Sequence, residues 1–339
     1  MSGTMQAIVL REIGGPQNLH LEEIAAPVAG PGEILIKVHY AAFNRRDVFI
    51  TQGLYPGIVF PVIPGSDGCG VVAAHGPGAS GPAVGAGVVI NPMLGWGDDP
   101  GVWRSDSLLL GMPRPGTFAE YVTAPAENVH PKPARLSDEQ AAAIPLGGLT
   151  AYRAVFTRGR CTKDDVVLIP GIGGGVQTFA FLFAKSTGAR TIVTSSSDAK
   201  LERAKALGAD VAINYKTSEN WSKDVRAQSG GGPTLVIDSA GGETFAKALD
   251  IARPGARVVT YGGTNGDAKI RMFSVFWKHL DILGTSMGSP EDFSAMLRLF
   301  AEGTLEPAID EIVTLADVPA AAQRVLDGEG FGKVVVRVR

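Results

Sequence analysis

Four glycines lie between a short apolar run, Val166–Ile169, and a stretch of helical periodicity from Val176 to Lys185. They are Gly171, Gly173, Gly174 and Gly175. A buried strand that ends in glycines and opens a helix presents free main-chain N–H groups and the positive end of the helix dipole to a pyrophosphate. Gln177 stands where the third glycine of this fingerprint is often found. The segment predicts that Gly171, Gly173, Gly174, Gly175 and Val176 bind a dinucleotide, the alternative being a tight turn without a ligand.

The next apolar run, Thr191–Thr194, ends in hydroxyl side chains instead of a carboxylate. A carboxylate at this point holds the ribose 2′-hydroxyl of NAD and repels the extra phosphate of NADP. Ser195 and Ser196, with Lys200 one helical turn later, offer charge-assisted hydrogen bonds to that phosphate. We therefore expect NADPH, although the serines also suit the cap of a helix starting near Asp198.

Strands must alternate with helices to position these residues, and the second half of the chain shows that alternation. Further strands are predicted at Val211–Ile213, Leu235–Ile237 and Arg257–Thr260, with a helix over Asp198–Leu207 that ends at Gly208. Continuous apolar strands separated by helices indicate an α/β fold with a parallel, doubly wound sheet.

The first third of the chain has a different pattern. Residues 33–40 alternate apolar and polar side chains, and glycines crowd the segment that follows, as in a compact β-barrel. The last 60 residues show one helical stretch, around Phe293–Phe300, and a terminal strand from Lys333 to Val338, which we expect to return to the barrel. The predicted domains are 1–130 with 281–339, and 131–280.

Several segments resemble the medium-chain dehydrogenase/reductase superfamily over essentially the whole chain. They are the runs 42–47 (AFNRRD), 64–70 (PGSDGCG), 116–122 (GTFAEYV), 148–152 (GLTAY), the glycine turn, and 201–209 (LERAKALGA). The resemblance implies a GroES-like β-barrel catalytic domain, a doubly wound Rossmann domain that binds NADP, and an active site in the cleft between them.

Zinc alcohol dehydrogenases of that superfamily carry a cysteine where this chain has Asn44, a histidine where it has Ser66, and a cysteine near Leu146 or Gly147. Zinc prefers thiolate, imidazole or carboxylate ligands, so we expect no metal. Residues 91–115 resemble the lobe that holds a structural zinc, and they contain no cysteine. The resemblance thus favours the zinc-independent quinone oxidoreductases and enone reductases.

In that branch, similarity implies that Tyr215 and Lys333 contact NADPH, and Gly262 is a further predicted cofactor-binding residue. The branch often has a tyrosine and an arginine shortly after the Asn44 motif, where this chain has Phe49 and Thr51. Hydride transfer to a quinone or conjugated enone spreads the developing charge over several atoms, so neutral donors suffice where a simple ketone needs a Lewis acid. Asn44 is the expected donor to the substrate oxygen, and Ser66 and Thr150 are further candidates that otherwise satisfy main-chain groups.

Length, cysteine content and net charge disfavour other classes of protein function. The chain has 339 residues, two cysteines and a net charge of −3, which favours no nucleic acid or membrane partner and fits a reducing cytoplasm. We expect an NADPH-dependent quinone oxidoreductase-like enzyme with a small-molecule substrate, and the resemblance suggests a homodimer. Two alternatives remain open: an alcohol dehydrogenase of the same superfamily, and a non-catalytic NADPH-binding protein.

Overall fold

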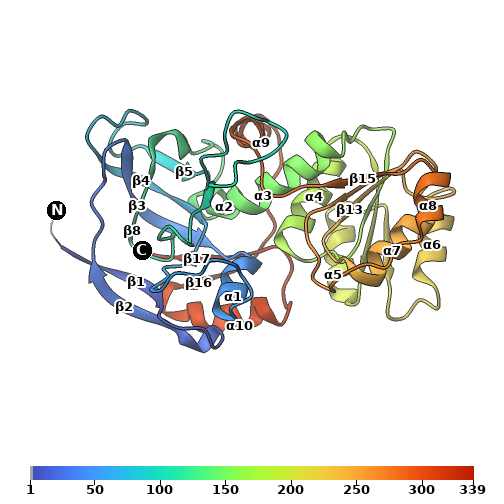
Figure 1. Cartoon of the computed structure of the whole chain (residues 1–339), viewed down its shortest axis with the longest axis horizontal. Helices are drawn as coiled ribbons and strands as arrows, with labels where there is room; N and C mark the ends of the chain where they lie inside the picture. The colour runs from blue at the N-terminus through green and yellow to red at the C-terminus, as the bar shows by residue number, and fades with distance from the viewer. Residues whose placement is uncertain (1–2) are drawn as a thin grey trace. The chain divides into compact units, whose positions relative to one another are not determined.

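The computed structural model describes residues 3–339, and the chain separates into two compact units. Unit 1 comprises residues 1–147 and 289–339, and unit 2 comprises residues 148–288. Figure 1 shows the strands and helices of each unit in chain order. No helix among residues 3–339 is long and apolar enough to cross a membrane.

Unit 1 is a β-barrel with short helices. Its strands are β1 (Thr4–Leu10), β2 (Leu19–Ala25), β3 (Glu33–Ala42), β4 (Asp67–His75), β5 (Gly87–Ile90), β6 (Met93–Leu94), β7 (Leu108–Leu109), β8 (Tyr121–Pro125), β9 (Val129–Pro131), β16 (Ile309–Thr314) and β17 (Lys333–Arg337). Its helices are α1 (Arg45–Thr51), α2 (Asp138–Ala143), α9 (Pro290–Glu302) and α10 (Val318–Leu326), and α3 (Pro145–Tyr152) begins in this unit.

Strand β3 organises the barrel because it pairs with β17, β4 and β8. Its alternating side chains Ile34, Ile36 and Val38 are fully buried in the barrel core, as period-two patterning predicts. Val335 of β17 and Asp67 of β4 both pair with Ala42 of β3. This register brings the start of β17, the end of β3 and the start of β4 to one edge of the sheet.

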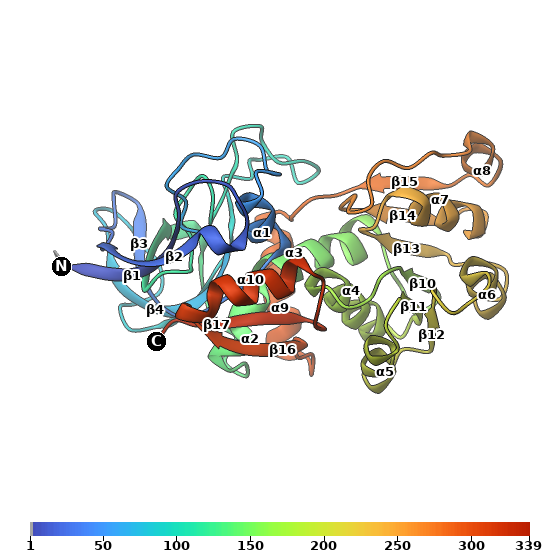
Figure 2. The same cartoon turned by 90° about the horizontal axis from the view of Figure 1, so that it is seen from below.

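The terminal strand was predicted correctly, and it returns to the barrel by pairing with β3. The expectation of a single helix in the last 60 residues was wrong, because α10 follows α9 and β16 precedes it. Figure 2 shows α10 beside β16 and β17, which it contacts. The buried side chains of α10 are Val318, Ala321 and Ala322, which are smaller than the buried Phe293, Met296 and Phe300 of α9.

Unit 2 is a doubly wound α/β fold, which confirms the predicted fold class. Six parallel strands lie in the order β12-β11-β10-β13-β14-β15. They are β10 (Val166–Ile169), β11 (Arg190–Ser195), β12 (Val211–Asn214), β13 (Leu235–Asp238), β14 (Arg257–Thr260) and β15 (Asp281–Gly284). The order reverses direction between β10 and β13, which is the switch point where ligands bind in such sheets.

Helices cover this sheet. They are α4 (Gly175–Ser186), α5 (Asp198–Ala206), α6 (Trp221–Gln228), α7 (Gly242–Ile251) and α8 (Met272–Trp277). The first two helices and five of the strands match the sequence prediction closely. The sequence analysis did not predict helices α6, α7 and α8 or strand β15. Val225 of α6 and Phe245 of α7 nevertheless pack in one buried cluster with the sheet.

Candidate functional site

Three elements of unit 1 converge on a buried polar cluster formed by Lys333, Asn44 and Asp67. Lys333 begins β17, Asn44 follows β3, and Asp67 begins β4. The main-chain N–H of Phe43 donates to the carbonyl of Val334 at 2.9 Å, which fixes the end of β3 beside the start of β17. Backbone pairing, set by the apolar pattern of the strands, therefore determines which polar side chains meet here.

The three side chains bond to one another. The ammonium of Lys333 donates to Asp67 Oδ2 at 2.6 Å and to Asn44 Oδ1 at 2.9 Å, and Asn44 Nδ2 donates to Asp67 Oδ2 at 2.9 Å. The remaining carboxylate oxygen, Asp67 Oδ1, accepts the main-chain N–H of Leu146 at 2.7 Å. Exposed fractions are 2% for Lys333, 0% for Asp67 and 8% for Asn44. A charge pair buried this deeply needs such complete hydrogen bonding.

Asn44 precedes helix α1, yet its amide is turned toward Lys333 and Asp67. Asp47 supports that arrangement, because its carboxylate accepts the main-chain N–H of Asn44 at 2.8 Å and that of Gly65 at 3.2 Å. Burial raises the pKa of Asp47 to about 6, while Arg46 opposes the rise. Asp47 thus braces the loop that carries Asn44.

Ser66 lies one residue before Asp67, and its hydroxyl already has one main-chain and one side-chain partner. It donates to the carbonyl of Leu110 at 2.7 Å and accepts from the guanidinium of Arg46 at 2.7 Å. The same guanidinium donates to the carbonyls of Leu110 and Met112. The Arg46 Nε atom is buried without a partner among the described residues. Ser66 therefore anchors α1 to the 110–112 loop in this structure.

In unit 2 the glycine turn between β10 and α4 is held by the end of β11. The N–H of Ile172 donates to the carbonyl of Thr194 at 2.7 Å, and the N–H of Gly171 donates to its hydroxyl at 3.2 Å. Gly171 and Gly173 have φ angles of 72° and 141°, which favour glycine. Gly174 is the N-cap of α4 and no side chain caps the helix. The first turn is thereby left open for an anion.

Lys200 lies over this turn. A Cβ atom added to Gly173 would lie 2.9 Å from Lys200 Cδ and 3.3 Å from its Nζ atom. Lys200 is on α5, whose N-cap Ser197 accepts the N–H of Lys200. Ser197 therefore caps helix α5, which is the alternative role considered for the serines, while Ser195 and Ser196 precede the cap.

Ser195 is buried at the end of β11, where its hydroxyl accepts the N–H of Ser197 at 3.2 Å. Tyr215 follows β12, and its N–H donates to the carbonyl of Ser195 at 3.0 Å. Its ring is 42% exposed. Unit 2 thus brings Ser195 and Tyr215 together, and it places Lys200 beside the glycine turn. Lys333 belongs to unit 1.

The carboxyl ends of β13, β14 and β15 carry polar atoms that sequence analysis missed. Asp238 Oδ1, the Tyr261 hydroxyl and Thr285 Oγ1 are buried without a hydrogen-bond partner in the described chain. Burial raises the pKa of the Asp238 carboxyl. Gln177 of α4 donates to the hydroxyl of Ser239 next to Asp238. Unpaired buried polar atoms are costly, which points to a ligand at these strand ends.

The remaining predicted residues are accounted for as follows. Gly262 follows β14, and a Cβ atom there would lie 3.2 Å from the carbonyl oxygen of Ser239. Thr150 belongs to unit 2, and its buried hydroxyl lies 3.8 Å from Met287 Sδ. Among residues 3–339, no group of three or more His, Cys, Asp or Glu side chains is arranged to hold a metal ion.

Both cysteines are buried. Burial raises the pKa of the Cys69 thiol far above its ordinary value. Burial raises the pKa of the Cys161 thiol as well. Neither thiol therefore has the lowered pKa that marks a reactive cysteine.

The ion pair between Lys333 and Asp67 was the main feature that sequence analysis missed. The resemblance implied a cofactor contact for Lys333 and named no partner for Asp67. A usable signal was present: Asp67 and Lys333 each begin a strand and are followed directly by apolar or small residues, and a charge buried in such surroundings requires a partner.

Comparisons with known proteins agree with this architecture. Residues 30–134 match the family model described as the alcohol dehydrogenase GroES-like domain, and residues 175–302 match that of the zinc-binding dehydrogenases. The chain belongs to the medium-chain dehydrogenase/reductase superfamily and is an oxidoreductase of that family.

Individual relatives differ in their named activities. The zinc-type alcohol dehydrogenase-like protein YogA of Leptosphaeria maculans is 36% identical, with 94% of each chain covered. The crystal structure of an NAD-dependent alcohol dehydrogenase has a TM-score of 0.92 and 37% identity, covering 99% of this chain and 100% of the other. The 2-octenoyl-CoA carboxylase reductase CinF, solved with NADP and 2-octenoyl-CoA, has a TM-score of 0.88 and 26% identity, with 99% and 88% covered.

Proposed function

We propose that this oxidoreductase transfers hydride from NADPH to a quinone or an α,β-unsaturated carbonyl compound without a metal ion. The observation that carries the proposal is the buried cluster of Lys333, Asn44 and Asp67, in which Asn44 occupies one of the positions where the resemblance places a metal ligand. Asn44 is the proposed donor to the substrate oxygen.

The donor set at this position does not fit zinc. An asparagine amide and a serine hydroxyl are poor zinc ligands, and Leu146 contributes no ligand atom. The Asn44 oxygen already accepts from the ammonium of Lys333, and the Ser66 hydroxyl donates to a carbonyl. A fixed ammonium within hydrogen-bond distance of the same oxygen also repels a second cation.

A site without a metal ion restricts the class of substrate that can accept hydride. Reduction of an unactivated ketone concentrates charge on one oxygen, whereas a quinone or enone distributes it over a conjugated system. The second amide N–H of Asn44 is a neutral donor suited to that weaker demand. The 2-octenoyl-CoA bound by CinF is itself an α,β-unsaturated carbonyl compound, which supports the same class of substrate.

The residues of unit 2 fit NADPH. When bound, this cofactor supplies the hydride. The open first turn of α4 suits its pyrophosphate, and Ser195, Ser196 and Lys200 suit its 2′-phosphate, with Tyr215 beside them. The unpartnered atoms of Asp238 and Thr285 and the close approach at Gly262 suit its nicotinamide end. The NADP in CinF supports this choice, whereas the alcohol dehydrogenase of 37% identity is NAD-dependent.

An alcohol dehydrogenase activity is the second candidate, because several relatives carry that name. It differs from the proposed function in requiring a metal or another strong electrophile for a simple carbonyl.

The test is a screen of NADPH and NADH oxidation against quinones, cyclic enones, enoyl thioesters and simple aldehydes, with metal analysis of the same preparation. Turnover of conjugated acceptors by metal-free protein is expected. Turnover of simple aldehydes that requires about one bound zinc per chain would favour the second candidate. Tight NADPH binding with no turnover of any acceptor would favour a non-catalytic NADPH-binding protein.

We also propose a homodimer, built through α8 and β15 of unit 2. Helix α8 exposes four large apolar side chains by 53 to 67%: Met272, Phe273, Phe276 and Trp277. The ring of Phe273 stacks on Trp277 with centroids 5.3 Å apart, so they form one apolar surface. Contiguous exposed apolar side chains of this size indicate a protein interface.

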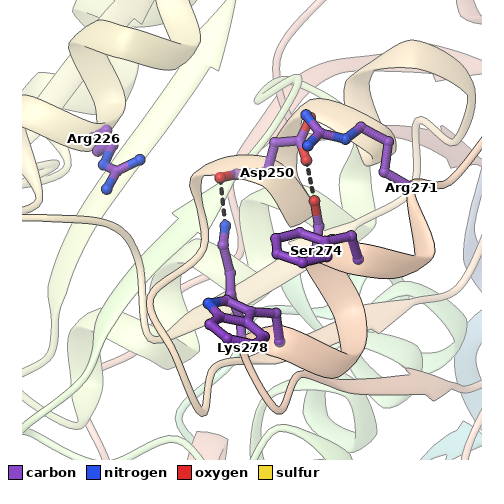
Figure 3. Close-up of a pocket in the computed structure, with 7 residues that line it drawn as sticks. Arg226, Asp250, Arg271, Ser274 and Lys278 are labelled. Carbon is purple, nitrogen blue, oxygen red and sulfur yellow. Dashed lines mark hydrogen bonds between the residues drawn. The ribbon is translucent and has the colours of Figure 1, made fainter.

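The helix is fixed to its neighbour α7 through Asp250 (Figure 3). Ser274 donates to the Asp250 carboxylate at 2.5 Å, and Lys278 donates to the Asp250 carbonyl at 2.5 Å. These bonds lie beside a cavity of about 220 Å³ that Arg226 and Arg271 also line. Fixing the polar side of α8 in this way keeps its aromatic side exposed.

Strand β15 supplies the geometry of the pairing. It is the edge strand of the sheet, and its Ile282 is 39% exposed. An open edge strand can pair antiparallel with the same strand of a second copy about a two-fold axis, which continues the sheet and covers both apolar surfaces. The occupant that we propose is therefore a second copy of this chain.

A further inference from the structure

We propose that Lys333 is a positioning residue that fixes the orientation of the Asn44 amide, so that an N–H group faces the substrate oxygen. The inference rests on the proposed function. It assigns to Lys333 a role other than direct contact with the cofactor, and it derives from the partners of its buried ammonium.

An asparagine amide can bind in two orientations that exchange its oxygen and its nitrogen. Here the ammonium of Lys333 lies 2.9 Å from Asn44 Oδ1, and the carboxylate of Asp67 lies 2.9 Å from Asn44 Nδ2. Turning the amide over would place two N–H groups against an ammonium and an oxygen against a carboxylate. Both contacts would be repulsive inside a buried site, so one orientation is fixed.

The fixed orientation leaves a defined donor. Asn44 Nδ2 has two N–H groups, and one of them donates to Asp67 Oδ2. Asp47 accepts the main-chain N–H of Asn44, which holds the start of α1 through a contact that does not use the Asn44 amide. The second N–H group is what remains for a substrate oxygen. Donors held in place before the reaction stabilise developing charge more than mobile donors do.

Lys333 also supplies the positive charge that balances the Asp67 carboxylate in this cluster. Asp67 is fully buried, and the Lys333 ammonium is its partner at 2.6 Å. Replacing Lys333 alone would therefore have two effects at once. It would leave the buried Asp67 carboxylate without a partner, which destabilises the fold, and it would release the Asn44 amide from its fixed orientation. The experiment must separate them.

The Lys333→Met/Asp67→Asn double variant makes that separation. It removes both charges at once, so that no buried charge lacks a partner. The comparison set is wild type, Lys333→Met, Lys333→Arg and the double variant, measured for thermal midpoint, NADPH affinity, and kcat and KM with cyclohexenone and with a simple benzoquinone. A neutron crystal structure of the double variant locates the amide hydrogens and so reports the orientation of Asn44 without any need for turnover.

The double variant is expected to regain most of the thermal midpoint that Lys333→Met loses, and to bind NADPH within about threefold of wild type. Its kcat is expected to stay about tenfold to hundredfold below wild type, as for supporting residues that orient a reacting group. Lys333→Arg keeps the charge and the donor, so it should retain more activity than Lys333→Met.

Two results would overturn the inference. Wild-type kcat in the double variant would leave Lys333 only a charge-balancing role. A loss of NADPH affinity that parallels the loss of kcat would make Lys333 a cofactor ligand. If wild type turns over no acceptor, the proposed function fails separately, and the neutron structure still decides: an Asn44 amide unchanged in the double variant contradicts the positioning role.

Discussion

Lys200 provides the sharpest prediction about the cofactor. Its side chain lies over the glycine turn, with its Nζ atom 3.3 Å from the Cβ position of Gly173. A hydrogen bond between charged groups contributes about 1.5 to 3 kcal/mol, so Lys200→Ala should weaken NADPH binding by about tenfold to 150-fold. NADH lacks the 2′-phosphate, so its affinity should change by less than about threefold.

The assay is fluorescence titration of both dinucleotides at fixed ionic strength, because the interaction is screened by salt. Lys205→Ala is the matched control, since Lys205 is on the same helix and pairs with the exposed Glu202. That control should leave both affinities unchanged. Equal losses of NADPH and NADH affinity in Lys200→Ala, or the same loss in Lys205→Ala, would refute the assignment of Lys200 to the 2′-phosphate.

Three further predictions concern separate features. Ser195→Asp should reduce the preference for NADPH over NADH by about tenfold or more, since a carboxylate repels the 2′-phosphate, and an unchanged ratio of dissociation constants would contradict this. The pKa of Asp47 rises from 3.8 to about 6 on folding. In the window between these two pH values, the folded protein retains a proton that the unfolded chain has lost. Stability should fall by about 3 kcal/mol as the pH rises through that window, and Asp47→Asn should abolish this slope in urea unfolding, whereas an unchanged slope would count against it. Phe276→Ser/Trp277→Ser should yield a monomer in analytical ultracentrifugation while the control Trp103→Ser does not, and a monomeric wild type would remove the proposed dimer.

The sequence was sufficient to predict the fold of unit 2 because its strands are continuous apolar runs with glycines at their ends. Val166–Ile169 and the glycine turn have that form, and both are where the pattern placed them. Helix α6 lacks it, because Val225 is its one buried side chain among polar neighbours. Strand β15 lacks it too, since an edge strand exposes much of its surface.

The candidate site could be predicted only in part. Motif positions singled out Asn44 and Ser66, but their partners come from distant parts of the chain: Lys333 is 289 residues from Asn44. Which charged side chain meets Asp67 depends on the register of β17 and β4 against β3, and that register is set by packing of the whole barrel. Local patterns do not contain this information.

The central claim is hydride transfer to a conjugated acceptor without a metal. Its most direct test uses chelator-treated protein of measured metal content, NADPH deuterated at the transferred position of its nicotinamide ring, and cyclohexenone. The account predicts that the saturated ketone carries one deuterium at the β carbon and that added zinc leaves the rate unchanged. Activity that disappears with the chelator and returns with zinc, or a product deuterated at the carbonyl carbon, would contradict it.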